Sequence, residues 1–262
     1  MSTIYAIDEK KLADVVLQKG SHSSPDEGVC LMEALAYVRG IAHTDHPPCV
    51  SPILGNYGRS LNDVLPDARR QDLKSLIPLL PGTADDGLDE TRSYIALDWL
   101  IRTYTPAWLD LAGLSDEARS LRELRRIVDL VAAQQAGPVV RAAQTKAAAA
   151  WAVARAASWA AARAAAAGDA ARAAAVGDAA RDAAGDAAWA VARAAAAGDA
   201  AGAAAVGDAV GAATRAAAWA VAAGDAVGDA ARDVLKPAVD QLQVSAIALF
   251  GEMIAPTSEA GA

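Results

Sequence analysis

The alanine-rich stretch from Trp159 to Arg232 decides the fold that we predict for this chain. It reads WAAARAAAAGDAARAAAVGDAARDAAGDAA (159–188), WAVARAAAAGDAAGAAAVGDAVGAATRAAA (189–218) and WAVAAGDAVGDAAR (219–232). Each of these three segments begins with a tryptophan, and successive tryptophans are 30 residues apart. A fixed period of this size is typical of stacked repeats.

Glycine followed by aspartate divides the tract further. Glycine tolerates the left-handed conformation that ends a helix, and aspartate can cap the helix that follows. The pairs therefore predict an α-solenoid of about 30-residue repeats, in which short and long helices alternate with Gly-Asp junctions between them (169–177, 178–198, 199–207 and 208–224). The alternative is one long kinked helix, which internal glycines disfavour by about 1 kcal/mol each.

The first 137 residues carry helix signals and no convincing strand alternation, so the fold class that we predict is all-α. Asp8 can cap a first helix that ends at Gly20, and Ser24 to Glu27 has the pattern of a capping box for a second helix that stops near Gly40. Prolines and polar caps predict the later boundaries, with helices starting at Pro52, Pro66, Leu88 and Ser115 and breaks at Pro81-Gly82, Thr105-Pro106 and Gly137-Pro138.

These breaks predict three parts. Residues 1–137 would form a helical N-terminal domain, and residues 138–236 the alanine-rich helical repeat domain. Residues 237–262 would form a capping helix and a flexible tail, because a solenoid exposes an apolar end that must be covered. The apolar positions of the capping helix lie between Ala238 and Ile254.

Composition and charge exclude several classes. The chain of 262 residues has a net charge of −8 and a pI of about 4.9, and it lacks the basic stripe that nucleic-acid-binding proteins carry. No apolar run is long enough for a membrane span, and the N-terminus does not have the pattern of a secretory signal. Two cysteines make no disulfide framework, so we expect a reducing, cytoplasmic location.

The candidate chemistry lies between His22 and Cys49, where all three histidines and both cysteines occur. Soft sulfur and imidazole ligands suit zinc, and four-coordinate zinc sites use such sets. The predicted metal ligands are Cys30, His43, His46 and Cys49, with Glu27, Glu33 and His22 as alternates. The spacing is not that of a standard zinc finger. The alternative is a buried cysteine on a helix beside a loop whose histidines bond to the backbone.

Three segments carry a resemblance to known proteins: SHSSPDEGVCLMEALAYV (21–38), HTDHPPCVSPIL (43–54) and ALDWLIRTYTPAWLDLAGL (96–114). They resemble a segment of uncharacterised proteins from actinobacteria and their phages, in which an alanine-rich repeat often follows. The tail is similar in style to the alanine repeats of proteins labelled putative immunity proteins. The resemblance implies no activity, substrate or catalytic residue.

Three functions follow as hypotheses. The first is a non-enzymatic interaction or scaffold protein, whose repeat surface binds a protein partner or a second copy of the chain, since long repeat surfaces are typical of binding scaffolds. The second is a metal-dependent, zinc-using hydrolase built on the cluster between His22 and Cys49. The third is binding to ice or another flat surface, against which the near absence of threonine from the tract argues.

Overall fold

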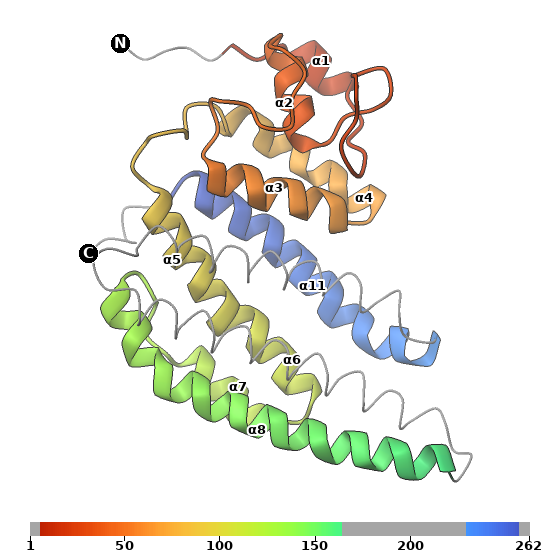
Figure 1. The fold of residues 1–262 in the computed structure, drawn as a ribbon, viewed down its shortest axis with the longest axis vertical. Coiled ribbons are helices and arrows are strands. Elements are labelled where there is room, and N and C mark those ends of the chain that lie inside the picture. Colours follow the sequence, from red (N-terminus) through yellow and green to blue (C-terminus); the bar gives the residue numbers. More distant parts are fainter. Residues whose placement is uncertain (1–5, 164–228, 257–262) are drawn as a thin grey trace. The chain divides into compact units, whose positions relative to one another are not determined.

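The computed structural model describes residues 6–163 and 229–256, and every regular element within these ranges is a helix (Figure 1). The predicted all-α class is thereby confirmed for the described residues. Most of the predicted solenoid, residues 164–228, lies outside them. The chain divides into two compact units, residues 1–92 with 243–262 and residues 93–242, and each is described by itself.

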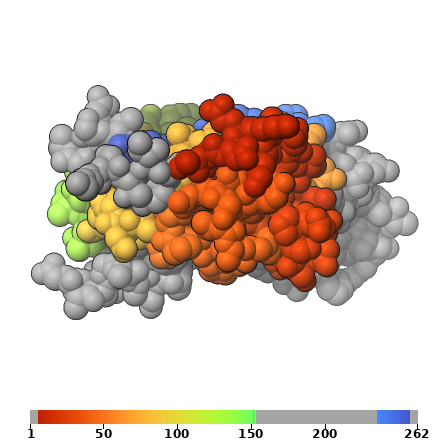
Figure 2. All heavy atoms as spheres, turned by 90° about the horizontal axis from the view of Figure 1, so that it is seen from above, coloured from red at the N-terminus to blue at the C-terminus, as the bar shows by residue number. Residues whose placement is uncertain are grey.

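The first unit combines the N-terminal helices with the end of the last helix. Its elements are α1 (Glu9–Asp14), α2 (Leu31–Arg39), α3 (Pro52–Val64), α4 (Asp67–Arg70), the 3-10 helix η1 (Gln71–Leu79), the first turn of α5 (Asp89–Trp99) and the last turns of α11 (Asp229–Ile254). Figure 2 shows the segments from α1 to α3, in red and orange, as one continuous surface.

The core of this unit forms where α3 meets α2 and the end of α11. A Cβ atom on Gly58 would lie 2.7 Å from Cε of Met32 and 2.8 Å from Cζ of Phe250, so a larger residue there would force these side chains to shift. Next to it, the fully buried Tyr57 donates its hydroxyl to the carbonyl oxygen of Ala246 at 3.1 Å. The close contacts of Gly58 and the hydrogen bond of Tyr57 thus join segments that are far apart in the sequence.

The first two helices differ from the prediction. Asp8 does cap α1, accepting a bond from the Lys11 amide at 3.1 Å, but the helix ends at Asp14 because Leu17 forms a parallel bridge with Val29. The predicted capping box from Ser24 to Glu27 was wrong. That segment forms turns, and α2 begins only at Leu31.

The later start at Pro52 is confirmed. Ser51 caps α3, and its hydroxyl accepts hydrogen bonds from the amides of Ile53 and Leu54. Proline suits the first turn because the amide that it lacks would have no partner there. The helix after Pro66 is short, since α4 passes into the 3-10 helix at Gln71.

The second unit is built from the rest of α5, the π-helical turn η2 (Leu100–Tyr104), α6 (Thr105–Leu111), α7 (Ser115–Arg122), α8 (Leu130–Arg163) and the first part of α11. Three aromatic rings form its centre. Trp99 and Tyr104 have centroids 5.5 Å apart, and Tyr104 and the fully buried Trp108 have centroids 6.2 Å apart.

The predicted break at Thr105-Pro106 was wrong, because helical turns continue through it. The Thr105 amide bonds to the carbonyl of Leu100, five residues earlier, and the Thr105 hydroxyl bonds to the same oxygen at 2.8 Å. This wider turn absorbs the missing amide of Pro106 without ending the run. The helix predicted to start at Ser115 was expected to continue towards the break at Gly137-Pro138, but α7 ends at Arg122.

Prolines also fail to break the two long helices. Gly137 and Pro138 lie inside α8, and Pro237 lies inside α11. Both predicted domain boundaries, after residues 137 and 236, therefore fall within continuous helices, and the break at Gly137-Pro138 was wrong. The division of the chain into three functional parts remains a prediction.

Small side chains pack one face of α8. Buried alanines recur along it at helical spacing, with exposed fractions of 0–4 % (Ala132, Ala133, Ala136, Ala143 and Ala147). Such a face lets neighbouring helices approach closely. No helix among the described residues is long and apolar enough to cross a membrane.

Candidate functional site

A buried carboxylate, Glu33, organises the part of the chain in which the metal site was predicted. It lies in the first turn of α2 with 1 % of its surface exposed. One oxygen accepts the amide of His22 at 2.8 Å, and the other accepts the amide of Cys30 at 2.8 Å and the Nδ1–H of His22 at 2.9 Å. Glu33 thus fixes both the start of α2 and the loop before it.

The hydrogen bonds decide the charge of Glu33. Burial by itself would raise the pKa of this carboxyl group, because a charge is costly in a poorly solvated place. The amides of Cys30 and His22, together with the His22 ring, outweigh burial and hold the pKa below its ordinary value. The group is therefore an ionised carboxylate near neutral pH.

His43 completes this cluster from the loop after α2. Its Nε2–H donates to the carbonyl oxygen of His22 at 2.8 Å and lies 3.8 Å from a carboxylate oxygen of Glu33. Its Nδ1 is buried and has no hydrogen-bond partner among the described residues. We call Glu33, His22, His43 and Cys30 the Glu33 cluster.

Among the described residues, no hydrogen bond or ion pair links the other predicted metal ligands to the Glu33 cluster. His46 bonds to its neighbour Asp45 at 2.6 Å and lines a second cavity of about 310 Å³ near Arg59. Cys49 is buried and Glu27 is exposed. Within the described ranges, no three His, Cys, Asp or Glu side chains are placed to hold a metal ion. The zinc site with Cys30, His43, His46 and Cys49 stays a prediction.

Cys30 is the N-cap of α2 and is buried. Its sulfur accepts the amide of Glu33 while Glu33 accepts the amide of Cys30, which is a reciprocal capping box. The sequence signal was a glutamate three residues after Cys30, just before the apolar run of α2. It was missed because cysteine is not among the usual N-cap residues.

Burial raises the pKa of the Cys30 thiol to about 12. Because the thiolate is the reactive form, we expect iodoacetamide to alkylate this thiol on the order of a thousandfold more slowly in the native protein than in denaturant at mildly alkaline pH. The Cys49→Ser variant isolates Cys30 for mass spectrometry. Alkylation of the native form at the denatured rate would contradict the buried cap.

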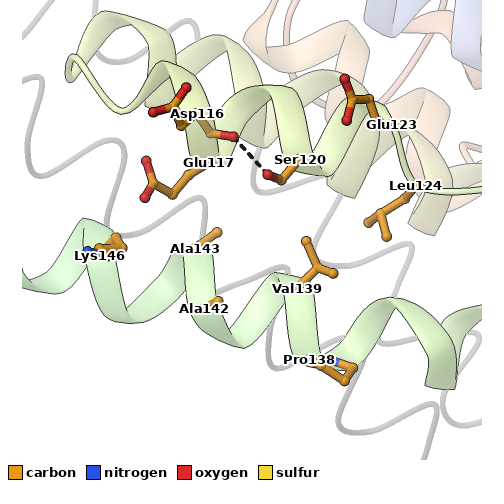
Figure 3. Close-up of a pocket in the computed structure, with 10 residues that line it drawn as sticks. All are labelled: Asp116, Glu117, Ser120, Glu123, Leu124, Pro138, Val139, Ala142, Ala143 and Lys146. Atoms are coloured by element: carbon orange, nitrogen blue, oxygen red, sulfur yellow. Dashed lines mark hydrogen bonds between the residues drawn. The ribbon is translucent and has the colours of Figure 1, made fainter.

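A groove between α7 and α8 is larger than the cavity beside His46, and sequence reasoning missed it because the two helices were expected to be differently bounded. It has a volume of about 550 Å³ (Figure 3). The two helices run antiparallel, so that Glu117 lies near Lys146 at one end and Leu124 lies near Val139 at the other. The floor is apolar and made of small or medium side chains (Leu124, Pro138, Val139, Ala142 and Ala143).

The α7 side of this groove carries acidic residues, and the α8 side contributes one cation, Lys146. On the α7 side lie Asp116, Glu117 and Glu123, of which Asp116 is paired with Arg119 at 3.0 Å. Helix α8 contains four cations and no acidic residue in its 34 positions. Glu117 and Glu123 have no ion-pair partner among the described residues, and the same holds for Lys146.

No family model, curated protein or solved structure matches the chain. The resemblance to alanine-rich proteins of actinobacteria and their phages therefore stays a prediction.

Proposed function

We propose that the chain is a non-enzymatic interaction protein that presents a helical, alanine-rich surface to a protein partner. The observation that carries this proposal is the groove between α7 and α8, whose apolar floor is flanked by Glu117, Glu123 and Lys146, which have no ion-pair partner within the described residues. Such a combination of an apolar centre and a charged rim is typical of protein interfaces. The repeats from residue 164 on enter the proposal only through their sequence.

The hydrogen bonds of the Glu33 cluster support the non-enzymatic part of this proposal. Both carboxylate oxygens of Glu33 accept backbone amides, and the imidazole of His43 donates to a backbone carbonyl. These groups hold the start of α2 and its flanking loops in place. Their bonds fit a structural role, whereas a general base needs an accessible lone pair within reach of a substrate.

Site-specific photo-cross-linking tests the proposal. A benzophenone amino acid in place of the exposed Ala142 would sit on the groove floor, and one in place of the exposed Asp26 serves as a control in the first unit. We expect one dominant cross-linked product from position 142 in cells that make the protein. The product should disappear when Glu117 and Glu123 are both changed to arginine.

Position 142 giving no more product than position 26 would contradict the proposal. A product that survives the double charge reversal would also contradict it, because the groove would then not be the binding surface. The identity of the cross-linked chain, another protein or a second copy of this one, is read by mass spectrometry of the product.

A further inference from the structure

The cavity beside His46 combines a mostly apolar lining with one permanently charged cation, Arg59. It lies at the start of α3, and its volume of about 310 Å³ is near the lower end of the range for small-molecule pockets. The apolar lining consists of three prolines and three other small or medium residues (Pro47, Pro48, Pro52, Val50, Gly55 and Ala84). We call it the Arg59 cavity. Its size and lining suit a small ligand with an apolar body.

The structure holds the guanidinium of Arg59 at this cavity. Its Nη1–H donates to the carbonyl oxygen of Asp45 at 2.8 Å, and Nη1 would lie 3.3 Å from a Cβ atom on Gly55, so the half-buried group lies against the first turn of α3. The bond to Asp45 uses one of the five N–H donors of a guanidinium. The other donors have no partner among the described residues. An acidic ligand would therefore meet a cation that is already positioned.

The backbone at the start of α3 is already satisfied and does not compete with Arg59 for this role. The hydroxyl of Ser51 accepts hydrogen bonds from the amides of Ile53 and Leu54. The carbonyl oxygen of Ser51 accepts the amide of Gly55 at 2.8 Å. The donors that remain for a ligand are therefore those of the Arg59 side chain, which stays charged at any pH at which the protein is folded.

Two carboxylates limit the charge that the ligand can carry. Asp85 is exposed and lines the cavity, and Asp45 bonds to His46, which also lines it. Both would repel a dianion such as phosphate, whereas a single carboxylate needs only the forked donors of Arg59. We infer that the Arg59 cavity binds a small monocarboxylic acid, with its carboxylate on Arg59 and its apolar body against the prolines. This site lies within the first unit and requires nothing of the groove between α7 and α8.

Titration of the isotope-labelled full chain with benzoate, followed through its amide chemical shifts by NMR, tests this site. The amides of Gly55, Arg59 and Ala84 should shift, with a dissociation constant on the order of 1 mM, as is usual for a ligand of this size. Benzamide has the same shape without the charge and should bind at least about tenfold more weakly. Inorganic phosphate near neutral pH should also bind at least about tenfold more weakly than benzoate, because Asp45 and Asp85 repel it.

Two variants assign the binding to the charges of the cavity. Arg59→Gln should weaken benzoate binding about tenfold. Asp85→Asn should strengthen it about twofold, because it removes a repelling charge and asparagine tolerates the left-handed backbone of residue 85. The matched control is Arg69→Gln, which removes a cation that does not line the cavity and should leave the affinity unchanged.

Three results would overturn the inference. The first is the absence of shifts at these amides at about 10 mM benzoate, ten times the expected dissociation constant. The second is equal affinity for benzoate and either benzamide or phosphate. The third is unchanged affinity in the folded Arg59→Gln variant, or weaker binding by Asp85→Asn. None of them bears on cross-linking from Ala142, so a failure of this site and a failure of the proposed function are told apart.

Discussion

Replacing Arg92 with methionine is expected to lower the free energy of unfolding of the first unit by about 3 kcal/mol. The Arg92 side chain is fully buried and bonds to the carbonyl oxygens of Met253 and Thr83 and to the carboxylates of Asp86 and Asp89. Removing one partner of a buried ion pair leaves the others without compensation. We expect a loss at the low end of the range that is usual for breaking a buried ion pair, because the carboxylates of Asp86 and Asp89 are partly exposed and can be hydrated.

The pH dependence of the free energy of unfolding provides a second test of this prediction. Burial opposes ionisation of Asp86, but its bonds to Arg92 outweigh burial and lower its pKa. A lowered carboxyl pKa contributes stability that is complete above the unfolded value, near pH 4, and is lost as pH falls through the folded value. The difference between the wild type and Arg92→Met should therefore be largest near neutral pH and should shrink in acid.

Urea unfolding followed by circular dichroism measures the effect, and hydrogen exchange of peptides from α3 assigns it to the first unit. Tryptophan fluorescence is a useful contrast, since all six tryptophans lie within residues 93–242. The matched control is Arg69→Met, which removes an exposed ion pair of 3.9 Å in the same unit and should cost less than about 1 kcal/mol. Equal effects of the two substitutions would contradict the buried-pair argument.

The all-helical character of the described residues was predictable from periodicity, and helix starts were predictable where a common cap residue was present. Asp8 was predicted as such a cap, and the start at Pro52 was predicted from the proline, next to the cap residue Ser51. The start of α2 was not. Ser24 to Glu27 satisfied the local rule, but the true start depends on a backbone bridge between Leu17 and Val29 and on the burial of Glu33. Both are properties of the folded unit.

Proline positions show the same limit. A proline inside a helix loses one hydrogen bond and strains the preceding turn, at a cost of about 3 kcal/mol. Pro106 avoids this cost through a wider turn, and Pro138 lies in a helix rich in alanine, the strongest helix former. The local sequence predicts a break at each of these prolines. The surroundings that compensate for the lost hydrogen bond cannot be recognised from the proline itself.

The candidate sites, too, were predictable only in part. The concentration of histidine and cysteine between His22 and Cys49 pointed to the correct neighbourhood, and Glu33, His22 and Cys30 do meet there. Their roles could not be predicted, because the groups that bind Glu33 are mainly backbone amides, which every residue has. The groove between α7 and α8 was missed because its walls come from helices whose ends were predicted wrongly.

Replacing Glu33 with glutamine should lower the free energy of unfolding of the first unit by about 2–3 kcal/mol. Glutamine keeps the shape of the side chain. Its NH₂ group, however, must face an N–H donor that bonds to a carboxylate oxygen of Glu33 in the wild type. Either the amide of His22 would lose its acceptor in a buried place, or the amide of Cys30 and the ring N–H of His22 would both lose theirs. Urea unfolding in the presence of a chelator measures this cost without any contribution from a bound metal ion.

The direction of the pH dependence distinguishes this carboxylate from a merely well-packed side chain. Because the folded pKa of Glu33 lies below its ordinary value, the stability that its charge contributes is complete above about pH 4.5 and is lost as pH falls through the folded value. Glu33→Gln should remove that part of the acid sensitivity as well as lowering stability at neutral pH. Glu27→Gln is the matched control, since Glu27 is exposed and accepts only the amide of Ser23, at 3.1 Å. A variant as stable as this control would mean that the Glu33 cluster does not hold the start of α2.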